Sequence, residues 1–160
     1  SMTVSSVASL MARAWPGGPT ALDLHQFTGL LALTFIGGHI LVLLGDRYIG
    51  YTIGQLLVPF ASSEYRPLWV GLGQLALYIT LPVTLTYYVR RFIGHRAWRS
   101  LHYGTFLVFV LVTLHGLLAG TDNGNPLILG MYGLAAVSVS LLTLYRILHR
   151  HRAVPRPARA

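Results

Sequence analysis

Four histidines lie within or at the ends of two strongly apolar stretches, in two pairs of similar spacing. Fourteen residues separate His25 from His39, and thirteen separate His102 from His115. Because an α-helix rises about 1.5 Å per residue, each pair spans about 20 Å along its helix. Imidazole is costly to place in hydrocarbon and is the commonest metal-binding side chain. We therefore expect the four histidines to hold metal-containing cofactors at two depths in a membrane.

The rotation per residue decides which imidazoles point in the same direction. Fourteen residues at about 100° each stop about 40° short of four turns, so His25 and His39 share one face of their helix. Thirteen residues leave His102 and His115 about 140° from a whole number of turns. A straight helix cannot present both on one face. Either this helix is distorted, or the two cofactors lie at different azimuths in the bundle.

The composition predicts a membrane protein. Of the 160 residues, 54% are hydrophobic and 10% are charged, whereas about a quarter of the residues in soluble domains are charged. The chain has no cysteine, which excludes disulfides, iron–sulfur clusters and thiolate or c-type attachment of haem. The net charge of +8 comes from arginines that flank apolar runs. That placement favours membrane topology over binding to nucleic acid.

Four segments are long and apolar enough to span a bilayer, which takes about 20 helical residues. They cover residues 22–44, 68–89, 101–119 and 127–148, and Pro82 favours a kink in the second. We predict an all-α membrane protein whose four transmembrane helices form a bundle around two stacked cofactors. This domain covers residues 22–148, between an amphiphilic lead (1–21) and a basic, Pro-rich tail (149–160). The apolar stretch 53–60 is too short to cross and favours an interfacial half-helix.

The arginines predict the orientation, because cytoplasmic loops carry the excess of positive charge. Ten of the twelve lie in the lead, in the loop between the second and third spans, or around the tail, whereas Arg47 and Arg66 lie between the first and second spans. Both termini are therefore expected on the cytoplasmic side of the inner membrane. The first and third helices then run in parallel. His25 should face His102 near the cytoplasm, and His39 should face His115 near the outer face.

Each facing pair could supply both axial nitrogens of one haem iron, because haem is flat, largely apolar and accepts two imidazoles. Two alternatives stay open at this point. Membrane histidines also form hydrogen bonds between helices, and a divalent metal could bind. A zinc site, however, needs three or four ligands in one small volume. Here the histidines fall at two depths, and the four carboxylates lie at helix ends or near the long loop.

Several other residues are placed to contact such cofactors. A haem carries two carboxylates, and buried anions need partners, so we expect Arg99, with Arg96, to serve the inner haem and Arg47 or Arg66 to serve the outer one. Glycines beside the histidines would admit a flat cofactor or serve ordinary helix packing. These glycines are Gly29, Gly37, Gly38, Gly104 and Gly116.

Phe109 is the candidate to fill the space between the two haems. It lies at mid-depth, seven residues after His102 and six before His115. Seven residues stop about 20° short of two turns, which places Phe109 on the face of His102. The alternative is an ordinary aromatic side chain that faces lipid or the core.

Flanking stretches carry a family resemblance. Four such stretches are PFAS (59–62), YRPLW (65–69), RAWRSLH (96–102) and HGLLAGTD (115–122). Together with the two histidine spacings, they resemble the ferric reductase-like transmembrane family. This family includes the membrane parts of ferric reductases and NADPH oxidases and the haem subunit of a bacterial periplasmic methionine sulfoxide reductase. The resemblance covers roughly residues 22–122. It implies two b-type haems with His25, His39, His102 and His115 as axial ligands of the iron.

These features together predict transmembrane electron transfer through two bis-histidine haems in a lipid bilayer. Many family members have six spanning helices and a cytoplasmic flavin domain, whereas four spans and no Gly-rich dinucleotide loop are found here. The donor would then be a separate flavoprotein or quinol, and the acceptor would lie on the outer face. Two alternatives stay open. One is reduction of ferric iron or oxygen at the outer haem, with the loop 45–67 as the substrate mouth, and the other is a non-enzymatic haem-binding sensory subunit.

Overall fold

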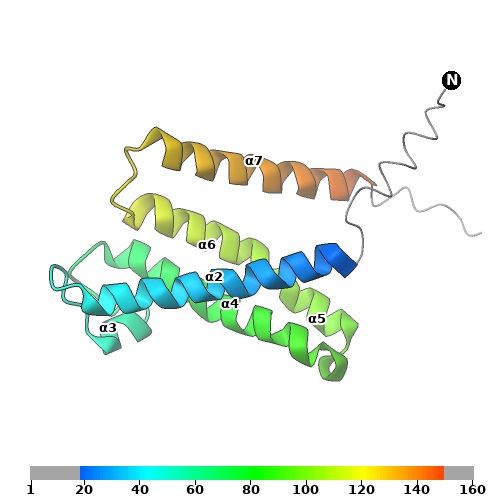
Figure 1. The fold of residues 1–160 in the computed structure, drawn as a ribbon, viewed down its shortest axis with the longest axis horizontal. Helices are drawn as coiled ribbons and strands as arrows, with labels where there is room; N and C mark the ends of the chain where they lie inside the picture. The colour runs from blue at the N-terminus through cyan, green and yellow to red at the C-terminus, as the bar shows by residue number, and fades with distance from the viewer. Residues whose placement is uncertain (1–18, 150–160) are drawn as a thin grey trace, which may run out of the picture.

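The computed structural model describes residues 19–149, and helices make up most of this part of the chain, with no strand among them (Figure 1). In chain order they are α2 (Pro19–Gly45), α3 (Ile53–Leu57), α4 (Pro67–Ile93), α5 (His95–His102), α6 (Gly104–Ala119) and α7 (Pro126–His149). The predicted all-helical class is confirmed for these residues. Most of the predicted lead and nearly all of the predicted tail lie outside the described residues.

Within residues 19–149, four helical stretches are long and apolar enough to cross a membrane, as predicted. They are Leu22–Gly45, Pro67–Ile93, His95–Ala119 and Pro126–Leu148. A helix pairs its own backbone groups, which is what a segment in hydrocarbon requires. Pro82 lies inside α4 without ending it.

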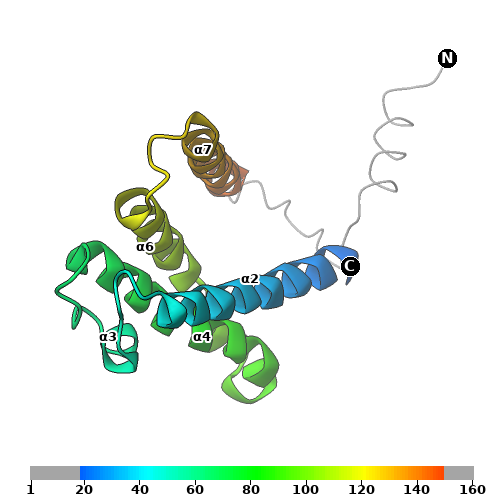
Figure 2. The ribbon, with the colours of Figure 1, turned by 60° about the vertical axis from the view of Figure 1, so that its left-hand side comes forward.

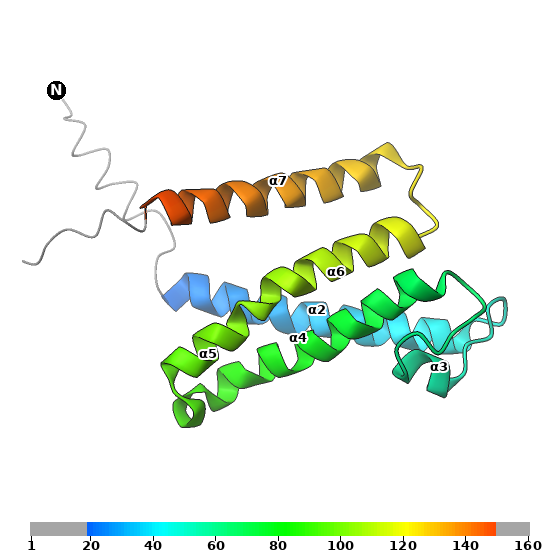
Figure 3. The same ribbon diagram turned by 180° about the vertical axis from the view of Figure 1, so that it is seen from behind.

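The helix α6 lies between α7 and α4, and the views from front and back agree on this order (Figures 1 and 3). The closest backbone packing joins α4 to α6 and to α5. The helices α2 and α7 lie further from this pair, and Figure 2 shows α7 on the far side of α6 from α2. The structure therefore has a packed α4–α6 centre flanked by two more loosely placed helices.

The third spanning segment differs from its prediction in two ways. It begins at His95, directly after Gly94, so residues 90–93 and 95–99 are helical and do not form a loop. Gly94 makes this tight join possible because its φ of +81° lies in the region that favours glycine. The segment is also interrupted at Tyr103, whose carbonyl accepts a hydrogen bond from the Phe106 N–H at 3.1 Å. Such an i to i+3 bond is tighter than an α-helical turn. The structure therefore contains a distortion of this helix, which was one of the two explanations for the thirteen-residue spacing.

The long loop contains α3, which is shorter than the predicted half-helix at 53–60. Thr52 caps this helix, since its hydroxyl accepts a hydrogen bond from the Gln55 N–H at 3.3 Å while the Gln55 side chain accepts one from the Thr52 N–H at 2.9 Å. This reciprocal pair is a capping box, which satisfies two of the otherwise unpaired donors at a helix start.

Candidate functional site

The helices α2, α5 and α6 bring the four histidines together as two facing pairs. The ring centroids of His25 and His102 are 5.9 Å apart, with their planes at 80°. The ring centroids of His39 and His115 are 6.3 Å apart, with their planes at 76°. The predicted facing of the pairs is confirmed by this geometry. Their role as metal ligands stays a prediction.

The two separations leave room for one metal ion between the two imidazoles of a pair. A histidine nitrogen binds a metal such as zinc at about 2 Å, and the centre of an imidazole lies about 1 Å behind that nitrogen. Two imidazoles on opposite sides of one ion therefore have centres about 6 Å apart. In direct hydrogen-bond contact the two nitrogens would be about 3 Å apart, and the ring centres about 5 Å.

Each pair offers two protein ligands, and this number limits which kind of metal site it can form. Within residues 19–149, no three side chains of His, Asp or Glu gather where they could hold one ion. A protein zinc site takes three or four such ligands, whereas haem brings four nitrogens of its own and needs two axial ligands. The two-imidazole sets therefore fit haem better than a bare divalent ion.

The imidazole of His115 is held in one orientation by α4. Its Nδ1 lies 2.9 Å from the backbone carbonyl oxygen of Trp69. A carbonyl can only accept, so Nδ1 carries a proton, and in the neutral imidazole the lone pair is then on Nε2. Metal-bound histidines typically make this kind of hydrogen bond through the nitrogen that does not bind the metal.

Gly73 allows this close approach, because a Cβ built there would lie 2.6 Å from Nδ1 of His115. No local pattern near His115 indicated Gly73, which lies on another helix, α4. By contrast, a Cβ at Gly29, Gly37 or Gly38 would meet nothing within 4 Å. A Cβ at Gly116 would collide with the hydroxyl of Tyr132 on α7, so this glycine serves helix packing.

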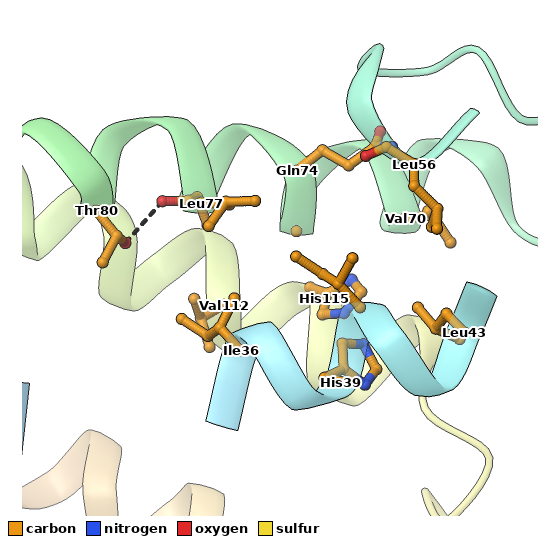
Figure 4. Close-up of a pocket in the computed structure, with 13 residues that line it drawn as sticks. Ile36, His39, Leu43, Leu56, Val70, Gln74, Leu77, Thr80, Val112 and His115 are labelled. Atoms are coloured by element: carbon orange, nitrogen blue, oxygen red, sulfur yellow. Dashed lines mark hydrogen bonds between the residues drawn. The ribbon is translucent and has the colours of Figure 1, made fainter. Parts of the chain in front are cut away.

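A cavity of about 160 Å³ lies beside the His39–His115 pair, between α2, α4 and α6. Figure 4 shows the two imidazoles on one side of it and Gln74 and Leu77 on the other. Apart from the two histidines, its lining includes two polar side chains, Gln74 and Thr80. The remaining lining is apolar and includes Ile36, Leu43, Leu56, Val70, Leu77 and Val112. The chemistry of this lining, mostly apolar with a few polar groups, is typical of sites that bind apolar cofactors.

The loop between α2 and α4 is fixed over this end by hydrogen bonds. The buried Gln74 amide donates to the carbonyls of Gln55 (2.6 Å) and Leu56 (2.9 Å) and accepts from the Phe60 N–H (3.2 Å). The phenol of Tyr51 is also buried, and this burial raises its pKa. The loop is therefore an ordered part of the site.

The end of the same loop is tied to α6. The Tyr65 hydroxyl donates to the Ala119 carbonyl at 2.8 Å, and Nη1 of Arg66 donates to the Leu118 carbonyl at 2.5 Å. The last carbonyls of a helix lack partners within it and carry partial negative charge, so a guanidinium is favourable there. Arg66 and Arg47, the two arginines expected near the outer cofactor, are both exposed, and Arg66 is bound to the end of α6.

At the end of the bundle that holds the His25–His102 pair, the rings of Trp98 and His102 are stacked, with centroids 5.2 Å apart and planes at 24°. Nε1 of Trp98 is buried and has no hydrogen-bond partner among the described residues. An unpaired buried donor is unfavourable, and a carboxylate of a haem bound to His25 and His102 would offer it an acceptor. Gln26 donates to the Tyr87 hydroxyl and links α2 to α4 beside His25.

The other predicted residues are placed as follows. Arg99 and Arg96 are exposed on α5, and Nη2 of Arg99 lies 2.8 Å from Nε2 of His95. Phe109 is half-buried on α6. Their expected contacts with cofactors stay predictions.

The chain is similar to curated bacterial proteins. It is 27% identical over 134 residues to the magnetosome protein MamZ of Paramagnetospirillum magneticum and 29% identical over 125 residues to MamZ of Magnetospirillum gryphiswaldense. These alignments cover 81% and 76% of the chain but 19% and 18% of the two relatives. It is 30% identical over 134 residues to the protein-methionine-sulfoxide reductase haem-binding subunit MsrQ of Rhodospirillum rubrum, which covers 82% of the chain and 62% of MsrQ. No family model and no solved structure matches the chain.

Proposed function

We propose that the chain belongs to the ferric reductase-like transmembrane family and carries electrons across a membrane through two b-type haems. The observation that carries this proposal is the geometry of the histidine pairs, with ring separations of 5.9 Å and 6.3 Å. The similarity to MsrQ, which is named as a haem-binding subunit, supports it. The four apolar helices support a multi-pass location in the membrane.

In this proposal His25 and His102 hold the inner haem, and His39 and His115 hold the outer one. A bound haem supplies a one-electron couple of its iron. The protein orients the imidazoles, as the bond from His115 to the Trp69 carbonyl does. It also surrounds the outer site with apolar side chains from α2, α3, α4 and α6 and the ordered loop above them. These groups exclude water and thereby tune the haem potential.

The arginine distribution supports an inner-membrane orientation with both termini in the cytoplasm. Electrons would then enter at the end marked by α5 and leave at the end covered by the loop 46–66. A separate flavoprotein or a membrane quinol would be the donor, and a protein or small molecule on the outer face would be the acceptor. In this proposal Arg99 and Arg96, which lie on α5 at the donor end, would pair with the carboxylates of an inner haem.

The test is haem content and spin state of the purified, detergent-solubilised chain. We expect two extractable haems per chain, because no cysteine is present to attach them covalently. Both should be low-spin, since two imidazoles complete each iron. Pyridine haemochrome analysis and electron paramagnetic resonance (EPR) measure these quantities. One haem per chain, or a high-spin ferric spectrum, contradicts the proposal.

Phe109→Ala is expected to slow electron transfer between the haems while leaving both bound. The side chain lies at mid-depth on α6, and a packed medium couples donor and acceptor better than a gap does. Flash-induced transfer between the haems, followed by absorbance, measures the rate. Val110→Ala is the matched control, because its side chain is exposed on the next position of the same helix. An unchanged rate with both haems present would assign Phe109 to packing alone.

A further inference from the structure

Three aromatic rings form a row along α5 that ends at the inner histidine pair. The rings of His95 and Trp98 have centroids 5.4 Å apart, and those of Trp98 and His102 have centroids 5.2 Å apart. Residues three and four apart are neighbours on one helix face, so the sequence spacing of these three residues produces the stack. The ring of His102 is therefore stacked on Trp98 and also faces His25.

The two histidines of the α5–α6 span are oriented by different means. A backbone carbonyl fixes His115 through Nδ1. Among the hydrogen bonds recorded for residues 19–149, none reaches a ring nitrogen of His102. The planes of His102 and Trp98 are 24° from parallel, and such offset stacking is a favoured arrangement of aromatic rings. The contact with Trp98 thus takes the place that the Trp69 carbonyl has at the outer site.

We propose that Trp98 is a positioning residue that sets the plane of the His102 imidazole at the inner haem. The inference rests on the proposed haem binding and adds to it a residue specific to one of the two sites. The plane matters because His25 and His102 meet at 80°. The relative orientation of two axial imidazoles sets how the d orbitals of a low-spin ferric iron split, and hence its EPR g values. A change at Trp98 should therefore alter the inner haem signal and leave the outer one unchanged.

The experiment compares Trp98→Phe with Trp98→Leu in the haem-loaded protein. Phenylalanine keeps a ring in the stack and removes Nε1–H, whereas leucine removes the ring. We expect Trp98→Leu to shift the g values of one of the two low-spin signals, or to lower the occupancy of that haem, while Trp98→Phe keeps the wild-type signals. Leu101→Ala is the matched control, because Leu101 is an exposed apolar residue on the same helix, next to His102.

Three other results would contradict the inference about Trp98, and a fourth would contradict the proposed function. If Trp98→Leu leaves both signals unchanged, stacking does not position His102 and the inference is wrong. It is also wrong if Trp98→Phe matches Trp98→Leu, because the effect then belongs to the Nε1–H. A similar change in Leu101→Ala would assign the effect to the helix as a whole and overturn the inference as well. Failure of the wild-type chain to bind two haems would instead overturn the proposed function.

Discussion

Replacing either histidine of a facing pair by alanine should remove one haem and leave the other in place. His39→Ala or His115→Ala should remove the outer haem, and His25→Ala or His102→Ala should remove the inner one. The reason is geometric, because each pair meets across about 6 Å while the two depths differ by about 20 Å along the helices. Haem content should fall by half in each single variant.

The assignment of pairs is tested by combining variants. His39→Ala with His115→Ala should still retain one haem, because both changes affect the same site. His39→Ala with His25→Ala should retain none. Circular dichroism and gel filtration must show that the helical content and the size of each variant match the wild type. If His25→Ala and His39→Ala each abolished the same spectroscopic signal, the pairing would be wrong.

Gly73→Ala should displace His115 and thereby empty the outer site. The added Cβ would lie 2.6 Å from Nδ1 and 2.8 Å from Cε1 of His115. The backbone of α4 carries this Cβ, so the imidazole has to move, and it loses its bond to the Trp69 carbonyl. Alanine favours a helix over glycine by about 1 kcal/mol, so lost helix propensity would not explain the effect. We expect the outer haem to be lost or reduced several-fold, with the inner haem retained.

Gly37→Ala is the matched control for this variant. A Cβ at Gly37 meets nothing within 4 Å, and two residues before His39 is about 200° around the helix, away from the imidazole. Haem content in this control should equal that of the wild type. Haem analysis and low-spin EPR signals read out both variants. Full occupancy of both sites in Gly73→Ala would mean that His115 approaches α4 differently when a cofactor is bound.

Some features of the site depended on contacts between residues far apart in the sequence. Trp69 and Gly73 on α4 orient His115 on α6, and no pattern near either residue indicates this. Gln74 fixes the loop through carbonyls of α3, and Tyr65 and Arg66 bind the end of α6. Such contacts join segments that meet only after the helices have packed, so periodicity and hydropathy cannot predict them.

The sequence by itself determined the four spans and the two depths of the histidines. Hydropathy is a property of each segment alone, and the rise of a helix per residue is fixed, so both follow without knowledge of packing. The rotation of 1300° also showed that a straight third helix could not present His102 and His115 together. Only the tertiary structure decided how this conflict is resolved. The helix is interrupted at Tyr103. The separations and angles at which the paired imidazoles meet follow from the packing of α2 against α5 and α6, which local sequence does not encode.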